Sequence, residues 1–144
     1  MSLHLIKLCV GASHPQDLEA WVAKRVAANK KSGRGAVHDH VTRMRPRRES
    51  ELLAGGSLYW VMKGAVRARQ RIIGLEDVAG ADGIRRTAIL LEPPLVLTAA
   101  QPRRAFQGWR YLTSDDAPED LKGNVSSTAA PPELTSELAN LGLL

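Results

Sequence analysis

The chain has 144 residues, of which 44% are hydrophobic, and both values are ordinary for one soluble globular domain. Its single cysteine, Cys9, excludes an internal disulfide, and no apolar run is long enough to span a membrane. The net charge is +5, but residues 113–144 hold six acids and one base, so the first 112 residues carry +10. This basic excess suits a polyanionic partner, although most charge runs are only solvated surface.

The first residues predict a buried strand. In the stretch from Leu3 to Val10 both alternating faces are apolar, as in a central strand of a sheet. It lacks the cationic start of a signal peptide and Lys7 interrupts it, so we expect a cytoplasmic protein. A helix is predicted near 14–28, with Ser13 as its N-cap and Trp21 as its anchor in the core.

Between this helix and the C-terminal region, the sequence predicts one short helix and several strands. Pro46 sets the start of the helix and Gly55-Gly56 its end. A turn at Gly64 joins the two most β-like segments into a hairpin, and Pro93-Pro94 must interrupt a sheet or lie at its edge. The predicted elements are a helix over 47–54 and strands over 38–45, 57–63, 66–75, 85–92 and 95–98.

The order of these elements predicts one α+β domain over residues 1–121. We expect a curved, mixed, mostly antiparallel sheet or a barrel, with two or three short helices. Residues 122–144 are rich in Ala, Ser, Pro and acids, and we expect them to form a low-complexity acidic tail that is dispensable for folding.

Three arginines alternate along the second strand of the predicted hairpin. Arg67, Arg69 and Arg71 would therefore share one strand face, and the residues expected on the opposite face are Val66, Ala68 and Ile72. Because the planar guanidinium binds phosphate oxygens in pairs, this row predicts contact with RNA or another polyanion. The competing interpretation is that the arginines pair with nearby carboxylates. The other basic residues assigned to the binding surface are Arg43, Arg45, Lys63 and Arg110.

Aromatic side chains offer a place for a base to stack. Trp60 and Trp109 are the candidates, the latter beside Arg110, although large aromatics at strand spacing are more often core. His38 and His40 share a strand face, but a lone HxH without a third ligand indicates zinc only weakly, and we predict no metal. The sequence contains neither GxSxG nor a glycine-rich phosphate loop, so it predicts no catalytic residue and no cofactor.

The function predicted from these features is non-catalytic binding of RNA or another nucleic acid through the basic strand face. Two alternatives stay open. The same arginines could line a pocket in an enzyme or small-ligand domain that recognises an anionic or nucleotide-like molecule. The acidic tail could instead serve a protein-interaction adaptor. No membrane partner is predicted, and the oligomeric state is not indicated.

Three segments resemble a known bacterial family: LHLIKLCVG at 3–11, VTRMRPRRESELLAGGSLYWVMKGAVRARQRI at 41–72 and FQGWRYL at 106–112. Their order is similar to that in the domain-of-unknown-function family numbered fourteen eighty-nine. Membership implies no established activity and no catalytic residues, and we expect the likeness to end near residue 121. At the level of fold, the Gly-Gly helix end and the basic strand RQRIIGLEDV are also similar to PUA-like barrels of the EVE and ASCH groups, which commonly bind RNA or modified bases. The ASCH signature is absent.

Overall fold

Strand β1 (Leu3–Leu8) lies between two other strands in the computed structural model, which describes residues 3–104 and 106–121. It pairs in parallel with β3 (Ser57–Met62) and antiparallel with β7 (Trp109–Thr113). The prediction of a central strand from two apolar faces is therefore confirmed, because both edges and both faces of β1 are covered. The strand ends earlier than predicted, and Val10 is 73% exposed.

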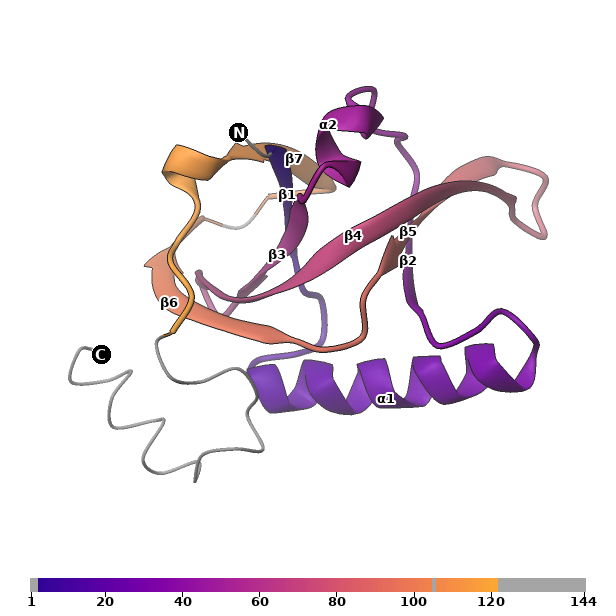
Figure 1. The fold of residues 1–144 in the computed structure, drawn as a ribbon, viewed down its shortest axis with the longest axis horizontal. Coiled ribbons are helices and arrows are strands. Elements are labelled where there is room, and N and C mark those ends of the chain that lie inside the picture. The colour runs from indigo at the N-terminus through magenta and orange to yellow at the C-terminus, as the bar shows by residue number, and fades with distance from the viewer. Residues whose placement is uncertain (1–2, 105, 122–144) are drawn as a thin grey trace.

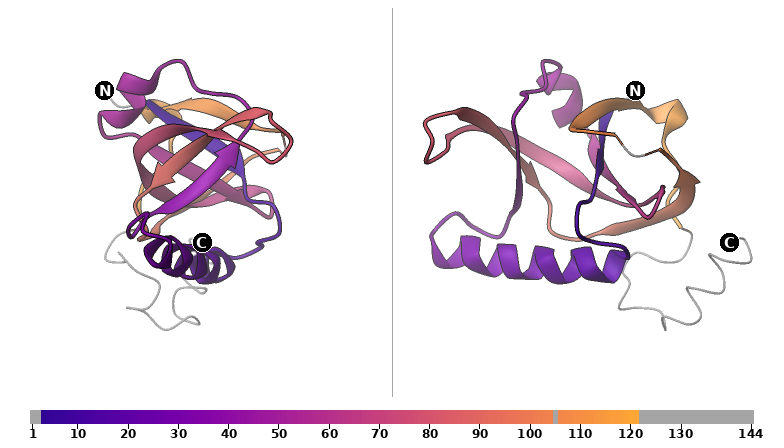
Figure 2. Two further views of the ribbon diagram at one scale, coloured as in Figure 1. Left: turned by 90° about the vertical axis from the view of Figure 1, so that its right-hand side faces the viewer. Right: turned by 180° about the vertical axis from the view of Figure 1, so that it is seen from behind.

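Seven strands form one mixed, mostly antiparallel sheet that curves around the core without closing (Figures 1 and 2). Its order is β2-β5-β4-β3-β1-β7, with β6 paired to β4 beside this path. The predicted α+β class and curved sheet are confirmed. A closed barrel is not formed, because β2 and β7 stand at opposite ends of the order and have one neighbour each within the described residues. The remaining strands are β2 (His38–Thr42), β4 (Ala65–Ala79), β5 (Arg85–Leu91) and β6 (Val96–Pro102).

The long strand β4 connects the parts of the sheet. Its first half pairs with β3 and β6, and its second half pairs with β5. The β3–β4 hairpin turns at Lys63 and Gly64, whose φ angles of 50° and 76° give the two-residue turn that matches strand twist. A bulge then leaves Arg67 without a partner on β3. This extra residue shifts the alternation of side chains. The prediction that Val66 shares a face with Ala68 and Ile72 is therefore wrong. Val66 packs with Tyr59 in a separate cluster.

Helix α1 (Pro15–Lys31) lies along one side of the curved sheet (Figure 1). Leu18 and Val22 bury its apolar side, whereas Trp21 is 45% exposed. The prediction that Trp21 anchors the helix in the core is wrong. Leu18 and Val22, four residues apart, already form the buried stripe, and the indole of Trp21 lies instead against the backbone of Gly11.

The start of α1 also differs from its prediction. The N-cap is His14 rather than Ser13. Asp17, at the third helical position, accepts the backbone N–H groups of both Ser13 and His14 at 3.2 Å. A carboxylate placed here accepts hydrogen bonds from backbone N–H groups that have no partner within the helix, and it interacts favourably with the positive end of the helix dipole. It therefore fixes the residue at which the helix begins.

Asp39 ties α1 to β2. Its side chain is 1% exposed, and its carboxylate accepts hydrogen bonds from Arg25 at 2.6 and 2.9 Å and from Asn29 at 2.9 Å. Asn29 also donates to the carbonyl oxygen of Val37 at 2.8 Å. The hydrogen bonds from the Arg25 guanidinium hold the pKa of Asp39 well below its usual range. An ion pair between the buried Asp39 and the half-exposed Arg25 thus fixes the C-terminal half of the helix.

The sheet buries side chains on both of its faces. The larger inner cluster joins α1, the short helix α2 (Glu49–Leu53) and the concave face of the sheet. The smaller cluster lies on the outer face and is covered by Phe106 and Ala117. Its members are Ile6, Tyr59, Val61, Val66 and Leu112. The segment that follows β7, including the 3-10 turn Ser114–Asp116, therefore lies over the outer face.

Candidate functional site

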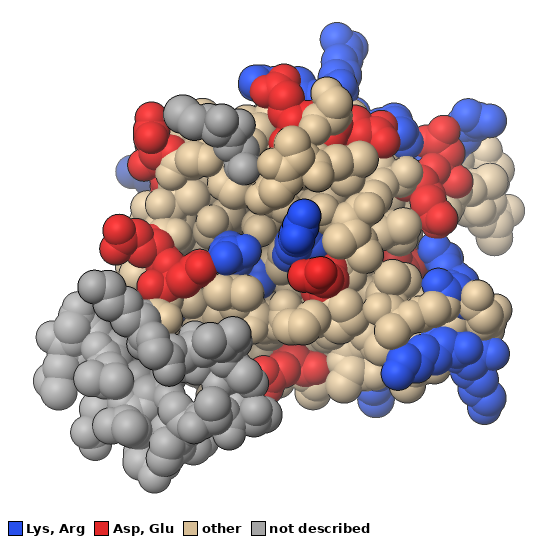
Figure 3. All heavy atoms as spheres, in the orientation of Figure 1, with Lys and Arg blue, Asp and Glu red and all other residues tan. Residues whose placement is uncertain are grey.

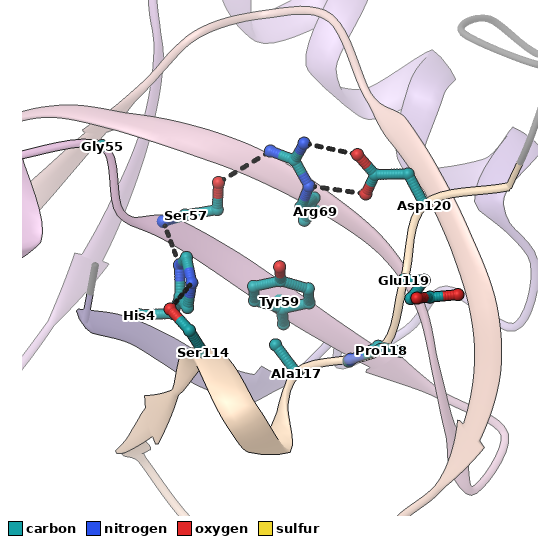
Figure 4. Close-up of a pocket in the computed structure, with 10 residues that line it drawn as sticks. All are labelled: His4, Gly55, Ser57, Tyr59, Arg69, Ser114, Ala117, Pro118, Glu119 and Asp120. Atoms are coloured by element: carbon teal, nitrogen blue, oxygen red, sulfur yellow. Dashed lines mark hydrogen bonds and ion pairs between the residues drawn. The ribbon is translucent and has the colours of Figure 1, made fainter. Parts of the chain in front are cut away.

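A pocket of about 440 Å³ lies on the outer face of the sheet, between strands β1, β3 and β4 and the segment 114–120 (Figure 4). Strand register brings its side chains together. Tyr59 is the direct cross-strand partner of Arg69, and His4 lies beside Ser57 because the next residues of the two strands, Leu5 and Leu58, are partners. The lining residues are His4, Gly55, Ser57, Tyr59, Arg69, Ser114, Ala117, Pro118, Glu119 and Asp120.

Arg69 is the cationic group of the pocket. Its Nε and Nη2 atoms donate to the two carboxylate oxygens of Asp120 at 2.8 and 2.7 Å, and Nη1 donates to the hydroxyl of Ser57 at 2.9 Å. The hydrogen bonds from Arg69 lower the pKa of Asp120, so this carboxyl is ionised at neutral pH. The guanidinium is therefore held in a fixed orientation by one strand residue and one residue of the covering segment.

Backbone pairing with β6 places Asp120. The N–H of Ala99 donates to the carbonyl oxygen of Glu119 at 2.8 Å, and the N–H of Leu121 donates to that of Leu97 at 2.9 Å. Asp120 itself faces Thr98 in an isolated antiparallel bridge. The wall of the pocket formed by residues 119–121 is thus attached to the sheet at its far edge.

His4 forms the opposite wall as a neutral imidazole. Its Nδ1 accepts the backbone N–H of Ser57 at 2.9 Å, so the proton of the neutral ring lies on Nε2, which is 3.3 Å from the hydroxyl of Ser114. Burial, and then the positive charge of Arg69, lower the pKa of His4 from 6.5. The ring of Tyr59 packs against it edge to face at 5.1 Å, and burial raises the pKa of that phenol.

The polar side chains of the pocket are engaged with one another. Both ring nitrogens of His4 are engaged with Ser57 and Ser114, so the imidazole is not positioned to take a proton from a nucleophile. Over residues 3–104 and 106–121, no three His, Cys, Asp or Glu side chains gather as metal ligands would. The pocket presents a guanidinium, hydroxyl groups, an imidazole and the carboxylates of Glu119 and Asp120 around a shallow, open depression.

The basic residues predicted from the sequence differ in their surroundings. Figure 3 shows basic groups that are separated on this face, many of them beside acidic groups. On β4, Arg67 donates to the carbonyl oxygen of Met62 at 2.9 Å, Arg69 enters the pocket, and Arg71 is exposed. Arg45 binds Glu49 and Asp77 at 2.6 and 2.7 Å. For Arg45 and Arg69, pairing with carboxylates is the interpretation that the geometry favours.

The other predicted site residues are dispersed. Arg43 is exposed, Lys63 lies in the hairpin turn, and Arg110 packs over the ring of Phe106 at 4.8 Å. Trp109 is partly buried, and its indole N–H donates to the carbonyl oxygen of Met44 at 2.8 Å. Trp60 is 2% exposed within the inner cluster, so its ring is not available to a base at the surface.

Sequence reasoning missed His4, Ser57 and Asp120 as members of a site. A signal existed for His4, because it is a polar residue within an otherwise apolar central strand. No such signal marks Asp120, because it lies 51 residues from Arg69 in a segment without periodicity.

Comparison with known proteins gives one match. A family model described as "Protein of unknown function (DUF1489)" matches residues 5–144. The matched range includes residues 122–144, so the expectation that the likeness ends near residue 121 is wrong. No curated protein and no solved structure matches significantly. The helices of the described residues are too short or too polar to cross a membrane.

Proposed function

We propose that this chain, which belongs to the DUF1489 family of unknown function, binds a small anionic, nucleotide-like ligand in the pocket around Arg69. The observation that carries the proposal is the guanidinium of Arg69, fixed at the wall of a concave polar space beside Ser57, Tyr59 and His4. Small-molecule sites are concave and place a few polar groups on rigid elements. The volume of about 440 Å³ is within the range of such sites.

The ligand's anionic group would take the place of the Asp120 carboxylate. The two N–H groups that Arg69 now directs at Asp120 have the geometry that binds a phosphate or another carboxylate in the same bidentate way. The side chain of Asp120 is 43% exposed, so it can turn into solvent and leave the N–H groups of Arg69 to a ligand anion. The hydroxyls of Ser57 and Tyr59 would then bind the polar body of the ligand.

Binding of RNA is the second candidate, and Arg71 is the observation that favours it. Arg71 lies next but one to Arg69 along β4, is exposed, and has no ion-pair partner within the described residues. A phosphodiester chain that places one phosphate on Arg69 would extend past Arg71. The excess of base over acid in residues 1–112 would add to the attraction.

Titrations of the wild type, Arg69→Gln and Arg71→Gln test the two candidates. Each protein receives nucleoside monophosphates and, separately, a single-stranded RNA, with amide chemical shifts as the readout and a thermal melt as the folding control. If the pocket is the site, Arg69→Gln weakens monophosphate binding about tenfold or more, because a charge-assisted bidentate contact is lost, and Arg71→Gln has little effect. If RNA is the ligand, each variant weakens RNA binding and flattens its salt dependence by about one unit of slope.

Two results would refute the proposal. One is the absence of binding of both monophosphates and RNA at low salt. The other is binding that a folded Arg69→Gln protein retains at wild-type affinity.

A further inference from the structure

A second group of polar side chains lies on the inner face of the sheet, opposite the Arg69 pocket. Lys7 is the cross-strand partner of Trp60 on β3 and of Trp109 on β7, so the three side chains share this face. His40 approaches from β2, and its ring meets that of Trp60 edge to face at 5.2 Å. The indole of Trp109 donates to Met44, just beyond β2, so the two ends of the curved sheet meet near these residues.

Two members of this group lack hydrogen-bond partners. The Nε2 atom of His40 is buried and unpaired within the described residues. Lys7 is partly buried and forms no ion pair or hydrogen bond there. Their neighbours are satisfied, because His38 and Trp60 both meet the side-chain oxygen of Gln70 at 3.0 Å. Buried polar groups are almost always paired, so the two exceptions need an explanation.

Within the described residues, no carboxylate forms an ion pair with Lys7 or with His40. Asp39 lies between His38 and His40 in sequence, but it points to the other face of β2 and is bound by Arg25. Cys9, which follows β1 and belongs to the inner cluster, stays a neutral thiol because burial raises its pKa to about 11. Burial likewise lowers the pKa of Lys7. The Lys7 ammonium group is therefore left without a carboxylate partner over residues 3–104 and 106–121.

We propose that Lys7 and His40 form a second binding site, which accepts an oxyanion, the carboxylate or phosphate group of a small ligand. The oxyanion accepts hydrogen bonds from the Lys7 ammonium group and from Nε2 of His40, and Trp109 forms a wall beside it. Lys7, His40 and Trp109 each remain partly exposed, whereas Nε2 of His40 itself is buried, so the anion reaches this atom through a small shift of the side chains around it. The site lies on the opposite face of the sheet from Arg69 and does not depend on the function proposed for that pocket.

The test is a titration of inorganic phosphate and of acetate into isotope-labelled full-length protein, followed by side-chain NMR signals. The variants are Lys7→Met and His40→Gln. Lys24→Met, on the exposed side of α1, is the matched control. We expect phosphate, acetate or both to shift the signals of Lys7, His40 and the Trp109 indole with saturation. Either site variant should weaken this binding at least tenfold, whereas Lys24→Met and Arg69→Gln should leave it unchanged.

A melting curve adds an independent readout. Lys7→Met should raise the melting temperature, because it removes a partly buried charge without a partner, while it abolishes anion binding. The proposal is overturned if neither anion shifts these signals, or if the shifts persist at wild-type affinity in the folded Lys7→Met or His40→Gln protein. Shifts confined to exposed lysines and arginines would show only nonspecific anion binding and would overturn it as well.

Discussion

Acidification should destabilise this protein through His40 before its carboxylates are protonated. Burial, and then the nearby charge of Lys7, lower the pKa of His40 from 6.5 to about 4. Between about pH 4 and pH 6.5, His40 is protonated in the unfolded chain and neutral in the folded chain, so acidification favours unfolding. The contribution of neutral His40 to stability is therefore complete above about pH 6.5 and is lost as the pH falls toward 4.

The size of this effect follows from the difference between the two pKa values. One pKa unit corresponds to about 1.4 kcal/mol, so the free energy of unfolding should fall by about 2.5 kcal/mol between about pH 7.5 and about pH 4.5 through His40 alone. This is a large share of the 5–15 kcal/mol that is typical of a folded domain. The pKa values of His4 and His38 are also lowered by burial, so these residues add to the loss.

Urea denaturation over this pH range, on the wild type and on His40→Gln, isolates the contribution of His40. Glutamine does not titrate, so the variant should lose about 2.5 kcal/mol less than the wild type over the same interval. NMR titration of the His40 ring in the folded protein gives its pKa directly. Equal pH dependence in the two proteins, or a His40 pKa near 6.5, would refute the reasoning.

Three further predictions concern single residues. Asp39→Ala should lower the free energy of unfolding by about 2 kcal/mol in urea denaturation, since it removes the hydrogen bonds that the buried carboxylate accepts from Arg25 and Asn29; a loss under about 0.5 kcal/mol would contradict this. Gly56→Ala should lower the free energy of unfolding by at least about 3 kcal/mol in the same assay, because a Cβ would collide with the backbone carbonyl oxygen of Leu3. Wild-type stability of this variant would contradict the prediction, since it would show that the backbone moves to make room for the Cβ. Cys9 should react slowly with a disulfide reagent at pH 8 in the folded protein, since it is buried with a raised pKa, and labelling as fast as in urea would disprove its burial.

Local patterns were sufficient to predict most of the fold. The two apolar faces of β1 indicated a central strand, and the glycines around β3 and β4 indicated a hairpin. These features depend on neighbours in sequence, which a single chain displays. The strand β7 was not predicted, because its residues Trp109 to Thr113 suggested only an aromatic cluster.

The candidate pocket was predictable only in part, since it depends on long-range contacts. The period of two along β4 correctly indicated that Arg69 leaves the core, but the bulge at Arg67 displaced Val66 from its expected face. Neither the bulge nor the pairing of Arg69 with Asp120 has a local signature. The sequence therefore indicated which basic side chains could bind an anion. The long-range contacts of the fold determined which of these side chains pair with carboxylates instead.

The position of β1 in the sheet has a consequence for the synthesis of the chain. This strand leaves the ribosome before either of its partners, which are β3, at residues 57–62, and β7, at residues 109–113. Until β7 emerges, β1 keeps an unpaired edge and two apolar faces, which is the kind of template on which chains aggregate. Folding of the nascent domain must therefore wait for nearly all of its described residues, and the N-terminal strand is among the last to be paired on both edges.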